Sequence, residues 1–128
     1  MDFGHNEASH ARVLVVDDEP SIRLLCRVNL ELDGYEVLEA GSVGEARERL
    51  ADAVDVVLLD VHLGDETSGV LVRECHAQRP PVPVVLVTGS ADVLLERSSS
   101  ADAVLPKPFD IDVLLSTVRE LAPVHVGR

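Results

Sequence analysis

Several residue types are scarce in this 128-residue chain, and each shortage excludes a class of protein. Tryptophan is absent and aromatic residues make up 2% of the sequence, so a folded core must be aliphatic. The only two cysteines, Cys26 and Cys75, lack metal-ligand spacing and are predicted to be reduced packing residues of a cytoplasmic protein. No apolar stretch approaches the roughly 18 residues that a membrane-spanning helix needs, which argues against a membrane protein.

Basic residues are also few. The chain has 11 lysines and arginines against 23 aspartates and glutamates, which gives a formal net charge of −12. Binding to a nucleic-acid backbone requires a basic footprint, so this balance argues against a nucleic-acid partner. It is compatible with a divalent cation or with a basic protein surface.

Four short apolar runs are present, and each is followed by a residue that is common in phosphoryl or metal chemistry. Runs of this length without polar alternation are typical of strands buried on both faces of a parallel sheet. The carboxyl ends of parallel strands lie along one edge, where open α/β sheets bind their ligands. The runs are Val13–Val16 before Asp17 and Asp18, Val56–Leu59 before Asp60, Val84–Val87 before Thr88, and Ala103–Leu105 before Lys107.

Helical patterns alternate with these runs. Gly34 is placed to end the first helix, and Ser42 with Glu45 forms a capping-box pattern before the second. Strands that alternate with helices predict a parallel sheet with helices on both faces. We expect one domain over residues 12–122, a disordered N-terminal lead over residues 1–11 and a C-terminal tail over residues 123–128. The predicted helices cover residues 20–33, 42–50, 69–78, 91–97 and 110–121.

The polar residues at the strand ends suit a charged ligand. Taken alone, Asp17 and Asp18 have a simpler explanation as a strand-end turn and a helix cap. Thr88 has a simpler explanation as an ordinary β-branched residue at a strand end. Asp60 at the end of another buried strand favours a shared site, because carboxylates on neighbouring strands repel one another without a cation. Mg²⁺ is a natural cation for such a site, and Lys107 adds a fixed positive charge that suits phosphate.

These groups together favour phosphoryl transfer. A carboxylate can act as the nucleophile and form an acyl phosphate. A metal ion and a lysine offset the charge on the transferred phosphoryl oxygens. No residue in the set resembles a base that would activate an alcohol substrate, so the nucleophile is expected to be the substrate itself.

An ordered set of short motifs extends over about residues 11–121, namely Val13–Pro20, Gly34–Val37, Val57–Asp60, Thr88-Gly89 and Lys107–Phe109. With this set the chain resembles the receiver domain of two-component response regulators. The resemblance implies an α/β fold: a flavodoxin-like (βα)5 three-layer sandwich with a central five-stranded parallel sheet in the strand order 2-1-3-4-5.

The resemblance also implies a role for each site residue. Asp60 would accept a phosphoryl group from a phosphohistidine. Asp17, Asp18, Asp60 and the backbone carbonyl of His62 would hold Mg²⁺. Thr88 and Lys107 would contact the phosphoryl oxygens. The protein would thus be a signalling phosphoacceptor that promotes its own phosphorylation and dephosphorylation, rather than an enzyme, and the family expectation for the Lys107–Pro108 bond is cis.

The partners implied by the resemblance are proteins. A sensor histidine kinase or a phosphotransfer protein would supply the phosphoryl group and dock on residues 21–28 and 108–110. A downstream protein or output domain would respond to a switched surface made of the fourth helix, the fifth strand and the fifth helix. Homodimerisation through the fourth and fifth helices is a further option.

The sequence departs from the family pattern at three places. Val104 stands where an aromatic residue is usual, Gly64 stands where proline is usual, and the segment from Thr88 to Lys107 is short. These departures keep an alternative open, a receiver-like interaction domain that no longer switches by phosphorylation. A phosphatase of the haloacid-dehalogenase type is disfavoured, because it needs an aspartate where His62 stands. A dinucleotide-binding domain is disfavoured because Asp17 and Asp18 replace the glycine-rich turn.

Overall fold

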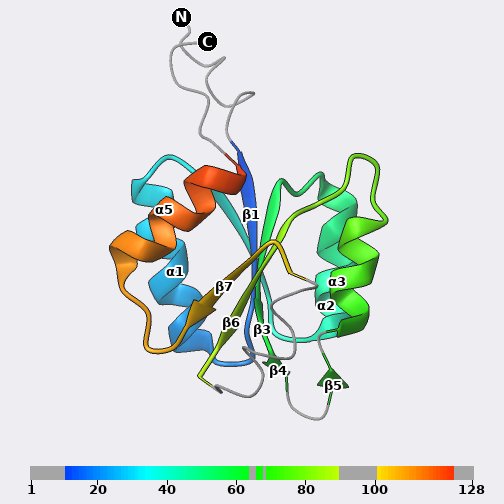
Figure 1. Ribbon diagram of the computed structural model, residues 1–128, viewed down its shortest axis with the longest axis horizontal. Coiled ribbons are helices and arrows are strands. Elements are labelled where there is room, and N and C mark those ends of the chain that lie inside the picture. The colour runs from blue at the N-terminus through cyan, green and yellow to red at the C-terminus, as the bar shows by residue number, and fades with distance from the viewer. Residues whose placement is uncertain (1–10, 64–65, 68, 90–100, 123–128) are drawn as a thin grey trace, which may run out of the picture.

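The computed structural model describes residues 11–63, 66–67, 69–89 and 101–122. Within these residues, five parallel strands form one sheet in the order β2-β1-β3-β6-β7 (Figure 1). Counted along the chain within this sheet, the order is 2-1-3-4-5, so the predicted topology is confirmed. The strands are β1 (Arg12–Val16), β2 (Glu36–Ala40), β3 (Val56–Asp60), β6 (Val84–Thr88) and β7 (Ala103–Pro106).

Helices cover both faces of the sheet (Figure 1). α1 (Pro20–Leu32) and α5 (Ile111–Leu121) lie on one face, and α2 (Val43–Arg49) and α3 (Gly69–His76) lie on the other. A 3₁₀ turn, η2 (Leu50–Asp52), follows α2. This is the predicted three-layer sandwich. The helix predicted over residues 91–97 lies outside the described residues. None of the described helices is long and apolar enough to cross a membrane.

The core consists of two aliphatic clusters, one on each face of the sheet. Leu14 and Val16 of β1 pack toward α2 and α3, whereas Val13 and Val15 pack toward α1 and α5. Alternate residues of a strand point to opposite faces, so a strand buried on both faces has no polar positions. This geometry accounts for the unbroken apolar runs in the sequence.

The predicted helix boundaries have the expected local chemistry. Gly34 has a φ of 100°, a left-handed conformation that favours glycine, just after α1. The Ser42 hydroxyl accepts a hydrogen bond from the Glu45 backbone N–H at 3.1 Å. The Glu45 carboxylate accepts from the backbone N–H of Gly41 at 2.6 Å, one residue before the N-cap that a capping box would use.

The segment that follows β3 contains an element that the sequence analysis does not include. β4 (His62–Leu63) and β5 (Glu66–Thr67) pair as a short antiparallel hairpin. Strands of two residues are too short to show a hydrophobic period. The pairing therefore could not be identified from the sequence pattern.

The two cysteines are buried thiols on opposite faces of the sheet, Cys26 in the α1 layer and Cys75 in α3. Burial raises the pKa of Cys26 to about 11 and that of Cys75 to about 12. Because only the thiolate is nucleophilic, we expect iodoacetamide at about pH 8 to leave the native protein unlabelled. In urea the same reagent should add two groups, as counted by intact-protein mass spectrometry. Rapid labelling of the native protein would contradict the burial of both thiols.

The same pKa shifts predict a loss of stability in alkaline solution. The folded protein holds both thiol protons more tightly than the unfolded chain, whose thiols have the ordinary pKa of 9.0. The stabilisation that Cys26 and Cys75 contribute is therefore complete below pH 9.0 and declines as the pH rises toward the folded values.

Candidate functional site

Four predicted site residues lie at the carboxyl edge of the sheet. Asp17 follows the last residue of β1, Asp60 ends β3, and Thr88 ends β6. Lys107 follows β7 directly. Because β1, β3, β6 and β7 are consecutive neighbours in the sheet, their ends form one continuous edge. The parallel topology thus brings together residues that are up to 90 positions apart in the sequence.

Three carboxylates form a compact cluster at this edge. Asp17, Asp18 and Asp60 each offer an oxygen, and these oxygens all lie within 4.8 Å of one another. Asp17 and Asp60 are buried, at 3% and 5% exposure, whereas Asp18 is exposed. Packing buried carboxylates so closely is costly unless a cation is present. The hard oxygen donors, one of them open to solvent, fit Mg²⁺, which keeps several waters and few protein carboxylates.

Lys107 brings one positive charge to the cluster. Its Nζ lies 3.5 Å from Asp17 Oδ2 and 3.6 Å from Asp60 Oδ2. The backbone N–H of Lys107 donates to the carbonyl oxygen of Thr88 at 2.8 Å, so the lysine is anchored to the end of β6. The Lys107–Pro108 peptide bond is cis, as the resemblance implies. A single ammonium leaves most of the carboxylate charge uncompensated, which preserves the attraction for a divalent cation.

Asp17 is held by the backbone around it. Its own N–H donates to the carbonyl oxygen of Ala40 in β2 at 3.0 Å. Its Oδ1 accepts a hydrogen bond from the Glu19 N–H at 2.9 Å. Oδ2 faces Lys107, so the carboxylate has a fixed orientation before any ligand binds.

The structure gives less detail on the contacts of Thr88 and His62. The Thr88 side chain is buried, at 1% exposure, at the end of β6 between the ends of β3 and β7. The backbone of His62 lies in β4, two residues after Asp60. Its carbonyl as a metal ligand, and the contact of Thr88 with phosphoryl oxygens, both stay predictions.

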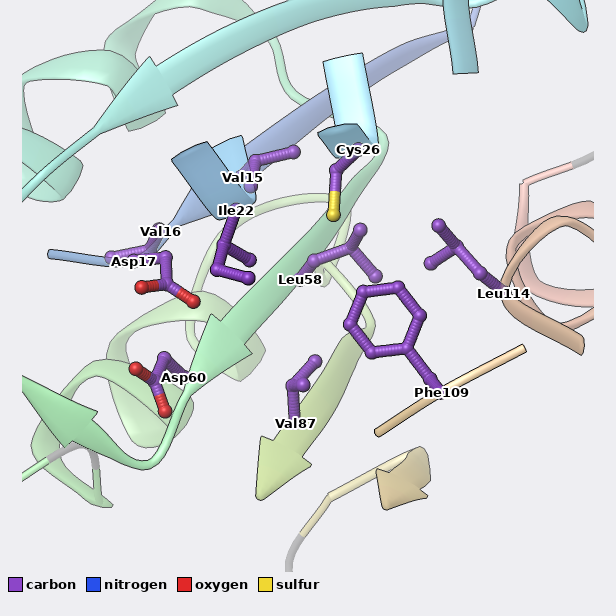
Figure 2. A pocket seen from close by; sticks show the side chains of 10 residues that line it. All are labelled: Val15, Val16, Asp17, Ile22, Cys26, Leu58, Asp60, Val87, Phe109 and Leu114. Atoms are coloured by element: carbon purple, nitrogen blue, oxygen red, sulfur yellow. The ribbon is translucent and has the colours of Figure 1, made fainter. Parts of the chain in front are cut away.

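A small cavity lies beside the carboxylates, between the sheet and the α1–α5 layer. Its volume is about 10 Å³, which suits no more than one water molecule. Figure 2 shows the Phe109 ring beside Leu58, with Cys26 and Leu114 close by, while Asp17 and Asp60 lie at the other end. An organic ligand does not fit in this space. The chemistry of the site therefore belongs to the solvent-facing side of the carboxylates.

Two residues near the site have structural positions that the motifs did not reveal. The guanidinium of Arg23 donates to the backbone carbonyl of Asp17. The only sequence signal is a basic residue in the first turns of the helix that follows Asp17 and Asp18. Val104 pairs with Leu86 across β6 and β7 and is half-buried against the α2–α3 core cluster.

Comparison with known proteins identifies a family over most of the chain. The family model described as "Response regulator receiver domain" matches residues 13–119. The matched region begins in β1 and ends in α5, so it includes every residue of the carboxylate cluster.

Curated relatives include a sensor kinase and a transcriptional regulator. Sensor kinase CckA of Brucella abortus is 37% identical over 117 residues, which are 87% of this chain and 12% of that protein. Transcriptional regulatory protein AruR of Pseudomonas aeruginosa is 36% identical over 119 residues, 86% of this chain and 48% of that protein. The chain thus spans about half, or much less, of the length of these relatives.

Solved structures have the same fold. A CheY-like response regulator receiver domain protein of Methanospirillum hungatei superposes with a TM-score of 0.79 at 31% identity, and covers 88% of this chain and 93% of its own. Response regulator TrrA of Thermotoga maritima, solved in complex with Mg(2+)-BeF, has a TM-score of 0.78 at 31% identity. It covers 87% of this chain and 98% of its own. The likeness extends over nearly the whole of both solved chains.

Proposed function

The chain belongs to the response regulator receiver domain family, and on that premise we propose that Asp60 accepts a phosphoryl group from a phosphohistidine. The observation that carries this proposal is the cluster of Asp17, Asp18 and Asp60 with Lys107 beside it. Asp60 is the proposed phosphoacceptor because it has the position that the family resemblance implies, at the end of the central strand β3 and 3.6 Å from Lys107 Nζ.

The reaction is a displacement at phosphorus. An oxygen of the Asp60 carboxylate attacks the phosphoryl group, an O–P bond forms, and the N–P bond of the donor phosphohistidine breaks. The electron pair of that bond stays on the imidazole of the donor. The product is an acyl phosphate on Asp60, and the phosphoryl group adds about −1.5 to −2 charges to the site.

The residues around Asp60 have separate roles. Asp17, Asp18, Asp60 and the carbonyl of His62 would hold Mg²⁺, which when bound offsets the negative charge of the phosphoryl oxygens. The Lys107 ammonium would pair with one of these oxygens, and the Thr88 hydroxyl would donate to another. The TrrA structure with Mg(2+)-BeF supports this assignment, since that relative has the same fold at 31% identity.

The proposed partners follow from the same chemistry. A sensor histidine kinase or a phosphotransfer protein supplies the phosphoryl group, and a downstream protein or output domain responds to the change in charge near Thr88 and Lys107. The proposal includes a cytoplasmic location and the option of a homodimer. With a net charge of −12, this segment itself is not proposed to bind nucleic acid. The non-switching alternative is not favoured, because the charged groups of the phosphoacceptor site lie together.

Acetyl phosphate with Mg²⁺ provides the direct test. We expect intact-protein mass spectrometry to show one added phosphoryl group on the wild type, and none on Asp60→Asn or in the presence of EDTA. Asp55→Asn is the matched control, since Asp55 precedes β3 at the opposite edge of the sheet. It should be phosphorylated like the wild type.

A titration with beryllofluoride, followed by NMR, covers the case in which acetyl phosphate is refused as a donor. Mg²⁺-dependent chemical-shift changes around Asp60 would support the phosphoacceptor. No phosphorylation and no beryllofluoride response, or equal phosphorylation of Asp60→Asn, would overturn the proposal.

A further inference from the structure

We infer that Arg23 is a positioning residue that holds Asp17 and Asp18 in the geometry needed to bind Mg²⁺. The inference rests on the proposed function, because it assigns Mg²⁺ to the carboxylate cluster. Arg23 belongs to α1 and lies outside the carboxylate cluster, so it acts through the backbone of Asp17.

Arg23 joins three parts of the structure. Its Nη1 donates to the backbone carbonyl oxygen of Asp17 at 2.6 Å. Its Nε donates to Oε1 of Glu39, in β2, at 3.0 Å. The side chain is 19% exposed, so both contacts are partly shielded from water. Arg23 thus connects α1, the β1–α1 loop and the end of β2.

The Asp17 carbonyl is a sensitive point of contact. It belongs to the peptide group that joins Asp17 to Asp18, so its direction determines how these two carboxylates are oriented relative to each other. The N–H of Asp17 is already held by Ala40 of β2. Arg23 fixes the opposite side of the residue, its carbonyl oxygen, one residue after the end of β1. Arginine suits this role, because its planar guanidinium makes two directed hydrogen bonds at once.

Glu39 balances the positive charge of Arg23, and the two side chains together form a clamp on the Asp17 backbone. It lies between Arg27, whose Nη1 is 2.8 Å from Glu39 Oε2, and Arg23. Hydrogen bonds from Arg27 and then Arg23 hold the pKa of Glu39 below its usual value, so the clamp is ionised at neutral pH. Gly41 leaves room for the Arg23 guanidinium, since a Cβ on Gly41 would lie 3.2 Å from Arg23 Nη1.

Loss of Arg23 is predicted to change the Mg²⁺ affinity in the direction opposite to the one that simple electrostatics predicts. Removing a positive charge close to a cation site should by itself strengthen Mg²⁺ binding. If Arg23 positions Asp17 and Asp18, its loss must weaken binding instead. Loss of an outer-shell partner typically lowers metal affinity about 10- to 100-fold.

Isothermal titration calorimetry of Mg²⁺ tests this directly. We expect the Kd of Arg23→Gln to rise about tenfold. Arg27→Gln is the matched control, because it removes the same charge and another hydrogen bond to Glu39 while leaving the Arg23–Asp17 contact in place. Its Kd should stay within about twofold of the wild type, as befits an exposed ion pair.

Two further variants separate position from charge. Arg23→Lys keeps the charge but cannot make both directed contacts, and Gly41→Ala keeps every charge while crowding the guanidinium. Both should weaken Mg²⁺ binding, each less than Arg23→Gln. If Arg23→Gln does not fold, as judged by circular dichroism, Gly41→Ala decides the question.

The outcomes also separate this inference from the proposed function. Equal or tighter Mg²⁺ binding by Arg23→Gln, or by Gly41→Ala if Arg23→Gln does not fold, overturns the positioning role. So does a wild type that binds no Mg²⁺. A wild type that binds Mg²⁺ with the expected ranking of variants, yet accepts no phosphoryl group and gives no beryllofluoride response, supports the positioning role and overturns the proposed function alone.

Discussion

Asp17→Asn is expected to weaken Mg²⁺ binding by about 100-fold, the upper end of the range for residues that only support a ligand. Asp17 is nearly fully buried, and its oxygens form part of the compact carboxylate cluster. Asparagine has the same shape and can still accept the Glu19 hydrogen bond, so the variant removes the charge and leaves the local backbone contact available.

The effect is measurable as a loss of metal-dependent stability. A ligand present at 100 times its Kd stabilises a folded protein by about 2.7 kcal/mol. In urea unfolding, the wild type should gain about this much from Mg²⁺ at that concentration, whereas Asp17→Asn, whose Kd would then equal the Mg²⁺ concentration, should gain only about 0.4 kcal/mol. Asp55→Asn, the same substitution at the other edge of the sheet, should respond to Mg²⁺ as the wild type does.

Without Mg²⁺, Asp17→Asn should be at least as stable as the wild type. The substitution relieves repulsion between Asp17 and its two neighbours, Asp18 and Asp60, which outnumber the single ammonium of Lys107. A free energy of unfolding that is clearly lower in the metal-free variant would show that Asp17 has mainly a structural role. An unchanged stabilisation by Mg²⁺ would show that the cation binds elsewhere.

Leu86→Ala is expected to have the largest effect on stability, a loss of about 2–5 kcal/mol in the free energy of unfolding. Leu86 is 1% exposed, lies in the middle of β6 and pairs in register with Leu59 of β3 and Val104 of β7. Both neighbouring strands restrict collapse of the space that the truncated side chain leaves. Since small domains are stable by only about 5–15 kcal/mol, this loss is a large fraction of the total.

Leu32→Ala is the matched control for this prediction. It removes the same atoms from a side chain that is 83% exposed at the end of α1. Its free energy of unfolding should lie within about 0.5 kcal/mol of the wild type. Urea unfolding followed by circular dichroism measures both variants. Equal midpoints for Leu86→Ala and the wild type would show that β6 is not part of the cooperative core.

The sequence alone determined the strands of the sheet and the edge at which the site lies. The apolar runs before Asp17, Asp60 and Thr88 lack polar alternation because both faces of each strand are buried. Parallel strands place such end residues on a common edge whatever the side-chain contacts are. For that reason the composition of the acidic cluster could be predicted before any contact was known, whereas the sheet order was predicted from the family resemblance that the ordered motifs carry.

The tertiary structure alone decided how the charges are arranged. The placement of Lys107 between Asp17 and Asp60, and the contact of Arg23 with the Asp17 carbonyl, depend on side-chain conformations of residues brought together by folding. The hairpin of β4 and β5 and the reach of Glu45 to Gly41 depend on backbone geometry over one or two residues. Periodicity and motif spacing record which residues share a face or an edge. They contain no information on where a flexible side chain ends, because that is set by packing and charge in the folded protein.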